Sequence, residues 1–329
     1  MTMHKGALRP LSLLLLALPC AFGHAAEAPA CHYVPVATLQ LRGSGDVWQP
    51  TVDGTINGNP AVLLADTGAA SSKLVKAWAD KYNVPLHQNG AYSQGISGTS
   101  VNYVARIDDI AVGDAHSGKT TMAVLGNMGK PPGFDGILGA NFLLQADLEI
   151  SLAEHKLKFY RAKDCADTYL AYWSADAMEI GFGGTETGHL DPRLIIEING
   201  TKMEAIIDTG ANFTSMTRAA AERAGIKVGD ANVERRGSST GIGDARIDTW
   251  QVEVDSFAIG SETIKHAHIG MRDNPPQGVS YRTPEVLIGA DFLRAHRVLI
   301  AMSQRRFYIS YLGGEVFPKR KPAVRAAPL

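Results

Sequence analysis

One four-residue phrase that occurs twice constrains the fold of this chain more than any other feature. Asp-Thr-Gly-Ala stands at residues 66–69 and again at residues 208–211, and each copy directly follows a short aliphatic run. A given tripeptide occurs by chance about once in several thousand positions, so two copies in matched surroundings do not come from composition alone. A repeat on this scale indicates a duplicated folding unit.

A second pair of matched phrases supports the duplication. Ile-Leu-Gly-Ala-Asn-Phe-Leu at residues 137–143 follows the first Asp-Thr-Gly, and Leu-Ile-Gly-Ala-Asp-Phe-Leu at residues 287–293 follows the second. The glycine of this phrase comes 73 residues after the aspartate in the first copy (66 to 139) and 81 in the second (208 to 289). Two such units can each present one carboxylate at a strand end and bring both together across a pseudo-twofold axis.

These paired phrases resemble those of aspartic proteases. The alanine after each glycine resembles the retropepsin-like branch rather than the pepsin branch, where serine usually stands. The resemblance covers about residues 48–312 and implies an all-β, bilobal acid-protease fold of two pseudo-twofold-related retropepsin-like β-barrel lobes with short helices. It also implies a single chain that carries both halves of what retroviruses assemble as a homodimer.

The resemblance implies the catalytic residues and the residues that support them. Asp66 and Asp208 would each supply one carboxylate of a dyad. Two carboxylates ~3 Å apart cannot both ionise, so they share one proton and titrate as a pair. The ionised partner takes a proton from water while the protonated partner hydrogen-bonds the scissile carbonyl. The residues expected to support this dyad are Thr67, Gly68, Thr209 and Gly210.

The neighbours of the two aspartates have distinct expected roles. Each glycine lacks a Cβ, so its loop can turn sharply and its N–H can reach a carboxylate oxygen. The threonines would hydrogen-bond across the axis and hold the loops in register. Ala69 and Ala211 replace the serine of pepsin-like sites, so a hydroxyl that would stabilise the ionised carboxylate is missing twice. Its loss raises the pKa of the pair and predicts activity between mildly acidic and near-neutral pH.

Local patterns place these phrases in a strand-rich framework. Asn-Gly at residues 57–58 and at residues 199–200 predicts a tight hairpin before each catalytic phrase. After Ser72, apolar residues at 74, 78 and 82 recur at helical spacing and predict a helix that Pro85 ends. In the second copy, Thr217 is expected to cap a short Ala-rich helix.

A glycine-marked bend follows each predicted helix, with alternating strand patterns on both sides. An ordinary hairpin turn explains either bend alone. The matched position in both copies favours flaps that fold over substrate, by analogy with this protease class. The residues of these predicted flaps are Gly95, Ile96, Ser97 and Gly98 in the first copy, and Gly241, Ile242 and Gly243 in the second.

The remaining segments follow from composition. A basic start, an apolar stretch at residues 11–22 and small residues before Glu27 predict a cleaved signal peptide that is too short to span a bilayer. Pro19 argues against a lipoprotein signal at Cys20. The predicted segments are a signal peptide at 1–25, an N-terminal arm at 26–47, lobe 1 at 48–162, a linker with interface-packing aromatics at 163–188, lobe 2 at 189–315 and a basic disordered tail at 316–329.

Two cysteines remain after removal of the signal. In an oxidising compartment an isolated pair most often forms a disulfide, so Cys31 and Cys165 are expected to join the arm to the linker. A metal site would need further clustered ligands, which the sequence lacks. We therefore expect no metal and no other cofactor.

The composition restricts the partners. The formal net charge of −1 favours neither nucleic acid nor an anionic membrane. The sequence predicts a periplasmic or secreted aspartic endopeptidase with a monomeric active unit, no membrane span after signal cleavage, and a peptide or protein substrate. A catalytically silent peptide-binding protein of the same fold is the alternative, and the intact Asp, Thr and Gly of both copies argue against it. Nothing in the residues supports a dyad enzyme acting on another substrate class.

Overall fold

Strands dominate the part of the chain that the structure, a computed structural model, describes. The described residues are 1–2, 30–42, 49–95, 97–126, 133–183, 192–239, 241–243, 245–274 and 283–320. The predicted signal peptide lies outside them apart from its first two residues, and so do Ile96 and the end of the predicted tail. Within these ranges no helix is both long enough and apolar enough to cross a membrane.

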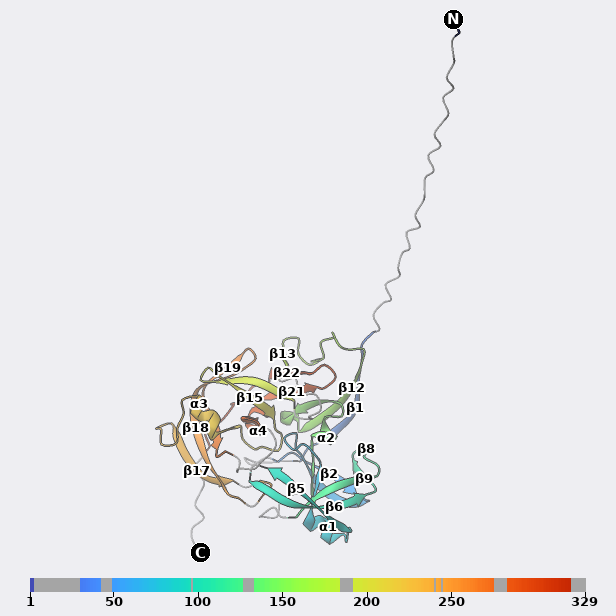
Figure 1. Ribbon diagram of the computed structural model, residues 1–329, viewed down its shortest axis with the longest axis vertical. Helices are drawn as coiled ribbons and strands as arrows, with labels where there is room; N and C mark the ends of the chain where they lie inside the picture. The colour runs from blue at the N-terminus through green and yellow to red at the C-terminus, as the bar shows by residue number, and fades with distance from the viewer. Residues whose placement is uncertain are drawn as a thin grey trace. The chain divides into compact units, whose positions relative to one another are not determined.

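The first lobe is a nine-stranded sheet with the order β5-β6-β9-β4-β10-β3-β2-β7-β8. Strands β5, β6 and β9 are seen at the lower right of the body in Figure 1. The strands span Thr51–Ile56 (β2), Asn59–Ala65 (β3), Lys73–Val75 (β4), Leu86–Gly95 (β5), Gly98–Ile107 (β6), Ile110–Val112 (β7), Ala115–His116 (β8), Thr120–Leu125 (β9) and Gly136–Leu138 (β10).

The second lobe is a seven-stranded sheet with the order β14-β15-β20-β16-β19-β18-β17. Strand β14 also pairs with β18, so the sheet closes on itself as a barrel does. The strands span Arg193–Ile198 (β14), Thr201–Ile207 (β15), Ser215–Thr217 (β16), Val233–Ser239 (β17), Ile247–Ile259 (β18), Glu262–Arg272 (β19) and Val286–Ile288 (β20).

A third, bridging sheet takes strands from both halves of the chain, in the order β1-β12-β11-β21-β22-β13. Its centre is the antiparallel pair β11 and β21, in which Leu148 lies opposite Ile300. Backbone hydrogen bonds therefore join the two halves directly. The strands span His32–Gln40 (β1), Asp147–Ser151 (β11), Lys156–Lys163 (β12), Met178–Gly181 (β13), His296–Ala301 (β21) and Arg306–Tyr311 (β22).

The helices in the described residues are short, as the predicted fold requires. Thr217 caps α3 as expected, because its Oγ1 accepts a hydrogen bond from the N–H of Ala220 at 3.2 Å. The predicted start of the first helix after Ser72 is wrong. Residues 73–75 instead form β4, because they pair with both β9 and β10. The helices span Lys76–Lys81 (α1), Ala140–Leu143 (α2), Arg218–Arg223 (α3) and Ala290–Leu293 (α4), with a 3₁₀ turn at Leu152–Glu154 (η1).

Both predicted Asn-Gly hairpins are present. Asn57 and Gly58 have φ values of 50° and 75°, and Asn199 and Gly200 have values of 49° and 73°. Positive φ at both central residues is the requirement of a type I′ turn, which Asn-Gly meets at low steric cost. Each hairpin delivers its second strand, β3 or β15, to one Asp-Thr-Gly loop.

The segment between the lobes packs on the bridging sheet. Leu170 and Trp173 belong to an apolar cluster with Leu299 of β21, Tyr308 of β22 and Tyr33 of β1. The aromatic composition of this segment is therefore explained by packing against strands from both halves of the chain.

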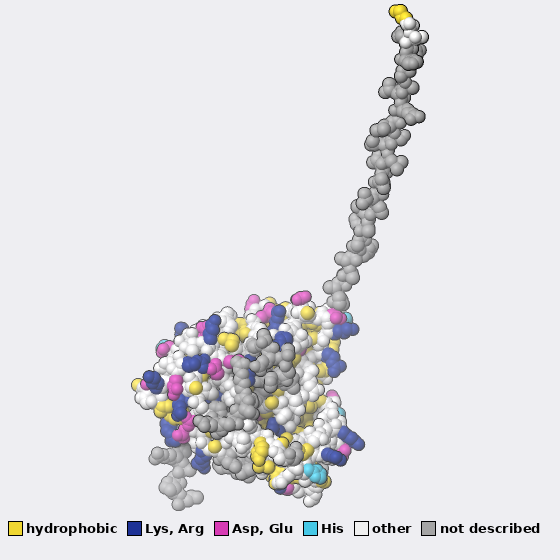
Figure 2. All heavy atoms as spheres, in the orientation of Figure 1, with side chains coloured by type: hydrophobic (Ala, Val, Ile, Leu, Met, Phe, Trp, Pro, Cys, Tyr) yellow, Lys and Arg dark blue, Asp and Glu magenta, His cyan; other side chains and the backbone are white. Residues whose placement is uncertain are grey.

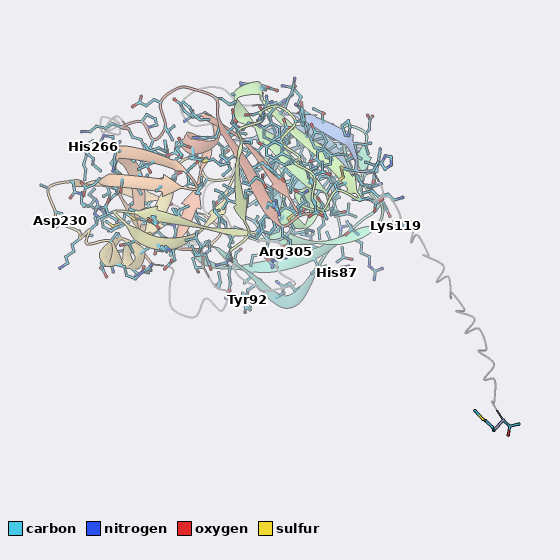
Figure 3. The ribbon with its side chains drawn as sticks, turned by 90° about the horizontal axis from the view of Figure 1, so that it is seen from above. His87, Tyr92, Lys119, Asp230, His266 and Arg305 are labelled. Atoms are coloured by element: carbon cyan, nitrogen blue, oxygen red, sulfur yellow. A yellow bond between two sulfur atoms is a disulfide. The ribbon has the colours of Figure 1, made fainter. Side chains whose placement is uncertain are left out.

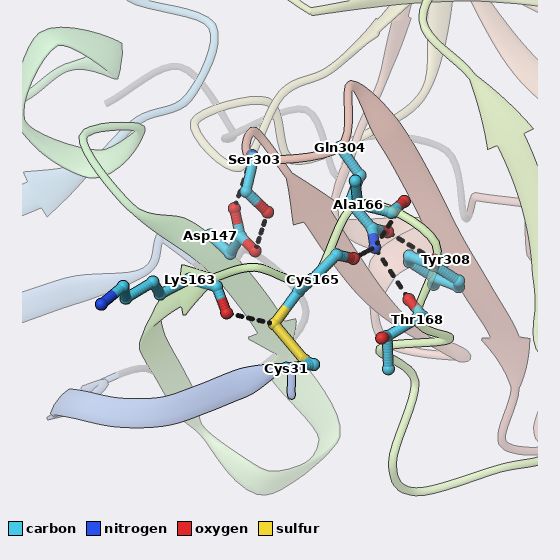
Figure 4. The surroundings of a disulfide bond; sticks show 9 residues. All are labelled: Cys31, Asp147, Lys163, Cys165, Ala166, Thr168, Ser303, Gln304 and Tyr308. Carbon is cyan, nitrogen blue, oxygen red and sulfur yellow. Dashed lines mark hydrogen bonds between the residues drawn. A yellow bond between two sulfur atoms is a disulfide. The ribbon is translucent and has the colours of Figure 1, made fainter. Parts of the chain in front are cut away.

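The predicted disulfide joins Cys31 to Cys165 (Figure 4). Cys31 directly precedes β1 and Cys165 closely follows β12, and these two strands pair antiparallel along most of their length. The side chain of Gln304 donates hydrogen bonds to the backbone carbonyls of Cys165 and Thr168. The bond thus ties the N-terminal strand to a segment that contacts the β21–β22 turn.

Removing this disulfide is expected to lower the stability of the mature protein by about 2–4 kcal/mol, because the bond closes a loop of 134 residues in the unfolded chain. Thermal unfolding of the Cys31→Ser/Cys165→Ser variant measures the loss. Reductant should lower the Tm of the wild-type protein to that of the variant and leave the variant unchanged. Two free thiols in the denatured, unreduced wild-type chain would refute the bridge.

Candidate active site

The two Asp-Thr-Gly loops leave their sheets in the same way. Asp66 follows β3, and its N–H donates a hydrogen bond to the carbonyl of Leu138 at 3.0 Å. Asp208 follows β15, and its N–H donates to the carbonyl of Ile288 at 2.9 Å. The acceptors end β10 and β20, which run parallel to β3 and β15. The second matched phrase of each copy therefore fixes the start of each loop.

The two threonines join the loops across the pseudo-twofold axis. Thr67 Oγ1 donates to the carbonyl of Ile207, and Thr209 Oγ1 donates to the carbonyl of Ala65, both at 2.7 Å. Each hydroxyl also accepts from the backbone N–H of the other threonine, at 3.0 and 3.1 Å. Both side chains are buried. This reciprocal set of bonds fixes the separation and register of the loops.

Backbone N–H groups hold each carboxyl in the same way. Asp66 Oδ1 accepts hydrogen bonds from Gly68 at 2.9 Å and from Ala69 at 3.1 Å. Asp208 Oδ1 accepts the equivalent pair, from residues 210 and 211, at the same two distances. Such bonds favour the ionised form of a carboxyl and fix its orientation.

Each glycine of the two loops lies against the carboxyl of the opposite loop. A Cβ on Gly68 would be 2.5 Å from Cγ of Asp208, and a Cβ on Gly210 would be 2.5 Å from Cγ of Asp66. The two carboxyls are hydrogen-bonded to each other. The absence of both Cβ atoms therefore permits the contact between the carboxyls.

Both carboxyls resist ionisation. Burial is the main cause that raises the pKa of Asp66 above its ordinary value, against the hydrogen bonds that lower it. Burial and then the charge of Asp66 raise the pKa of Asp208 well above the ordinary range. Asp208 is 8% exposed, whereas Asp66 is only half-buried. A pair of this kind holds one shared proton over a wide pH range.

Four further residues repeat around the loops and were not predicted as site residues. The backbone N–H and Oγ of Ser72 donate to Asn141 Oδ1 at 2.6 and 2.9 Å. In the second copy, the corresponding atoms of Thr214 donate to Asp291 Oδ1 at 2.8 and 2.7 Å. Each pair links a loop to the helix of the second matched phrase. Aligning the two copies residue by residue would have identified them. Ser72 and Thr214 stand six residues after the aspartate of their copy, and Asn141 and Asp291 stand two residues after the glycine of the second matched phrase.

The two predicted flaps contact each other. The first bend closes the β5–β6 hairpin at the pair Gly95 and Gly98, and the second lies between β17 and β18. Ser97 Oγ accepts a hydrogen bond from the N–H of Gly241 at 2.7 Å, and the Ser97 carbonyl accepts one from Ala245 at 3.0 Å. Ser97 is only 1% exposed. A backbone and side-chain latch therefore connects the bends.

The glycines at this contact are sterically required. A Cβ on Gly95 would lie 2.7 Å from Cβ of Ile242. Gly243 has a φ of +111°, and a Cβ there would lie 2.3 Å from the carbonyl oxygen of Ser97. Ile96 lies outside the described residues, so the structure gives no contact for it.

Ile242 of the second lobe packs onto the first lobe. Its partners form an apolar cluster on the part of the first lobe that carries the Asp66 loop. The second bend therefore reaches over the first lobe, next to the residue that follows Gly68. The cluster consists of Leu64, Val75, Leu125, Phe134 and Ile137, with Val62 and Ala69 at its edge.

The outer face of the first hairpin is exposed and partly apolar. Tyr92 lies opposite Val101 on β5 and β6, and the two side chains are 64% and 47% exposed. Figure 3 shows Tyr92 on this hairpin, at the surface of the molecule. The inner and outer faces of the hairpin thus differ in accessibility.

Charged side chains do not gather into a field of one sign on the visible face. In Figure 2, Lys and Arg side chains are interspersed with Asp and Glu over the described surface. Nucleic-acid interfaces require clustered basic side chains. In the described ranges, no group of three or more His, Cys, Asp or Glu side chains is placed to hold a metal ion.

Comparisons with known proteins agree with this geometry. A family model described as "Aspartyl protease" matches residues 52–142 and 194–292, one segment for each copy of the repeat. The crystal structure of an aspartic proteinase from Irpex lacteus matches with a TM-score of 0.51 and 16% sequence identity. The match covers 86% of this chain and 97% of that chain, and at this identity it shows the fold alone. No curated protein matches the sequence.

Proposed function

The chain belongs to the aspartyl protease family, in its retropepsin-like form with two tandem lobes, and from that premise we propose that it is an aspartic endopeptidase. It hydrolyses peptide bonds with a water molecule activated by Asp66 and Asp208. The observation that carries the proposal is the contact between these two carboxyls, each held by an equivalent pair of backbone N–H groups. One carboxyl comes from each lobe.

The chemistry follows from the shared proton. The ionised carboxylate takes a proton from the water as the water oxygen bonds to the scissile carbonyl carbon, while the protonated carboxyl donates to the carbonyl oxygen. The tetrahedral intermediate then breaks its C–N bond as the carboxyl that took the proton from water donates it to the amine nitrogen, and a hydroxyl of the intermediate returns its proton to the other carboxylate. The products are a carboxylic acid and an amine. The supporting residues Thr67, Gly68, Thr209 and Gly210 keep the two carboxyls at the separation that this exchange needs.

The bends complete the proposed site. Residues 95–98 and 241–243 would lie over a bound peptide and exclude bulk water from the reacting carbonyl, which strengthens the electrostatic interactions there. Because the bends hydrogen-bond each other through Ser97, a substrate must displace or reach beneath this contact. The side chains that set sequence preference would lie on these bends and on the apolar cluster beneath Ile242.

A catalytically silent peptide-binding protein is the alternative. Decay of a protease into a binding protein would remove the groups that hold the dyad, and this chain keeps them in both lobes. The test is to incubate the purified mature chain with a diverse peptide mixture, with and without a pepstatin-type transition-state analogue. Cleavage that the analogue suppresses supports the enzyme. Analogue binding without cleavage supports the silent binding protein.

The disulfide indicates the kind of compartment in which the mature chain works. A bond of this kind persists in oxidising compartments, so we propose that the mature chain works in the periplasm or outside the cell after removal of residues 1–25. The active unit would be a monomer, since one chain carries both carboxylates. Its partner would be a peptide or protein substrate, and the proposed mechanism uses no cofactor.

Activity is expected to peak between mildly acidic and near-neutral pH. Burial raises the pKa of Asp66, and burial together with the charge of Asp66 raises the pKa of Asp208, so the singly protonated pair persists to higher pH than in a site with ordinary carboxyls. A profile of kcat/KM against pH on a cleaved peptide measures this window.

The two alanines provide the control for this pH profile. Replacing Ala69 and Ala211 by serine should supply a hydroxyl near each carboxylate, lower the pKa of the pair and shift the profile to lower pH. A wild-type optimum in the strongly acidic range, with no activity left near neutrality, would show that other groups set the titration.

A further inference from the structure

One charged side chain breaks the pseudo-twofold symmetry of the site. Lys73 stands seven residues after Asp66, at the start of β4. The corresponding residue, seven after Asp208, is Ser215 at the start of β16. The hydrogen bonds to the two carboxyls are otherwise equal in type and length, so this difference between the lobes requires an explanation.

Strand pairing places Lys73 on the same face of the sheet as Asp66. Ile137 of β10 lies directly between Leu64 of β3 and Lys73 of β4. Side chains of direct cross-strand neighbours share a face, and Asp66 follows Leu64 by two residues. Val75, two residues beyond Lys73, belongs to the same apolar cluster as Leu64 and Ile137, which confirms the alternation.

The second lobe repeats this row with a neutral residue. Leu287 of β20 lies between Ile206 of β15 and Ser215 of β16. The two rows are thus Leu, Ile, Lys and Ile, Leu, Ser. The lysine is the only charged residue in either row.

The ammonium group of Lys73 is held in place but not neutralised by its hydrogen-bond partners. Its Nζ donates to the carbonyl of Ser71 at 3.0 Å and to Ser71 Oγ at 2.8 Å. The residue is 9% exposed. A buried cation with neutral partners is unfavourable unless an opposite charge lies nearby. Burial lowers the pKa of Lys73, and the negative charge of Asp66 opposes this and favours the ammonium form.

The other charged groups on the elements around the loops have partners of their own. Asp135, next to β10, accepts a hydrogen bond from the N–H of Val62 at 2.8 Å. Lys76 of α1 pairs with Asp80 at 2.7 Å. Asp291 of α4 accepts two hydrogen bonds from the second loop. The charge of Lys73 favours the ionised form of Asp66, whereas Arg320, whose guanidinium lies over the Phe213 ring of the second loop, favours the ionised form of Asp291.

We propose that Lys73 is a positioning residue that assigns the two roles within the dyad. Its ammonium holds the negative charge on Asp66 and leaves the shared proton on Asp208. Asp66 then takes the proton from water, and Asp208 donates to the carbonyl oxygen of the peptide. This inference rests on the proposed function for its chemistry. Burial raises the pKa of both carboxyls, the charge of Lys73 opposes this rise at Asp66, and the pKa of Asp208 is raised further, in the direction that this assignment requires.

Three variants test the proposal. Lys73→Met removes the charge and keeps much of the side-chain length, Lys73→Arg keeps a charge, and Ser215→Met places the same side chain at the matched position of the other lobe. Loss of a nearby cation in a partly buried site raises the pKa of a carboxyl by about one unit. Both limbs of the kcat/KM profile should therefore move about one unit to higher pH in Lys73→Met. They should stay in place in Lys73→Arg and Ser215→Met.

A direct titration tests the charge assignment without turnover. Carboxyl ¹³C resonances of the dyad are followed against pH by NMR in protein labelled at aspartate Cγ, and each is assigned by its loss in Asp66→Asn or Asp208→Asn. Asp66 should report mainly on the first ionisation step and Asp208 on the second. In Lys73→Met both resonances should respond in both steps, whereas in Lys73→Arg each should still report mainly on its own step.

The two readouts separate failure of this inference from failure of the proposed function. If the wild-type chain cleaves no peptide, but Lys73→Met loses the assignment of each ionisation step to one residue, the charge assignment is supported and the proposed enzyme is refuted. If each residue still reports on its own ionisation step in Lys73→Met, or in Lys73→Gln should the methionine variant not fold, the inference is overturned. A change in preference for acidic substrate side chains with no shift of the pH profile would also overturn it, because Lys73 would then be a substrate-binding residue.

Discussion

Replacing either Asp66 or Asp208 by asparagine is expected to lower kcat/KM for peptide hydrolysis at least about 10³-fold, because the dyad acts as a unit and neither carboxyl can activate water alone. Asparagine keeps an oxygen that can accept the two backbone hydrogen bonds at each position. The fold should therefore persist, with an unchanged or higher Tm, since each variant removes one of the two carboxyls that burial disfavours in the ionised form. Initial rates on a cleaved peptide and thermal unfolding measure both effects.

Asp291→Asn is the matched control for this experiment. Asp291 is also buried and has a raised pKa, mainly because of burial, but it lies behind the second loop rather than in the dyad. The first copy already has Asn141 at the equivalent position, where its side-chain oxygen accepts the same hydrogen bonds. We expect nearly wild-type activity in this variant. Substantial activity in either dyad variant would contradict the two-carboxylate mechanism.

Gly68→Ala or Gly210→Ala is expected to reduce activity at least about 100-fold, because a displacement of about 1 Å at the reacting groups has an effect of this size. In each variant the new Cβ would lie 2.5 Å from Cγ of the opposite aspartate, so a carboxyl or a loop must move. The steric conflict should also destabilise the fold by about 1–3 kcal/mol. Peptide hydrolysis and chemical denaturation of the same samples measure both effects.

Gly181→Ala is the control for a general effect of losing a glycine. A Cβ at Gly181 meets no atom within 4 Å, and its φ lies outside the left-handed region. We expect this variant to have the same stability and the same peptide-cleaving activity as the wild-type protein. Wild-type activity in both loop variants would mean that the carboxyls do not rely on the close contact with the opposite loop.

Repetition in the sequence predicted a duplicated folding unit. The family resemblance carried by the repeated phrases implied an all-β fold with two lobes, and the structure confirms it. The Asn-Gly hairpins and the cap at Thr217 were predicted from local chemistry that leaves few alternatives. The disulfide was predicted because only two cysteines remain after the signal.

Features that depend on tertiary pairing could not be predicted in the same way. Apolar residues at helical spacing after Ser72 suggested a helix, but Leu74 and its neighbours pair with two strands that are distant in sequence. The bridging sheet likewise combines six strands from the two ends and the middle of the chain. Sequence periodicity carries no information on such partners.

The asymmetry of the candidate site also could not be predicted from the repeated phrases. Comparison of the two copies favours what they share, so no role was predicted for Lys73 or Ser215. Their relation to the dyad became visible through the cross-strand rows that contain Ile137 and Leu287. The hydrogen bonds of Ser97 to Gly241 and Ala245 were not predicted either, because these partners lie in the other copy of the repeat.

The central claim is that one chain supplies both carboxylates of one peptide-hydrolysing dyad. It is tested most directly by titrating the hydrolysis of a cleaved peptide with a tight-binding transition-state analogue, at chain concentrations above the inhibition constant. The account predicts that activity falls linearly and reaches zero at one analogue per chain. An end point at one analogue per two chains, or hydrolysis that persists with the analogue bound, would contradict it.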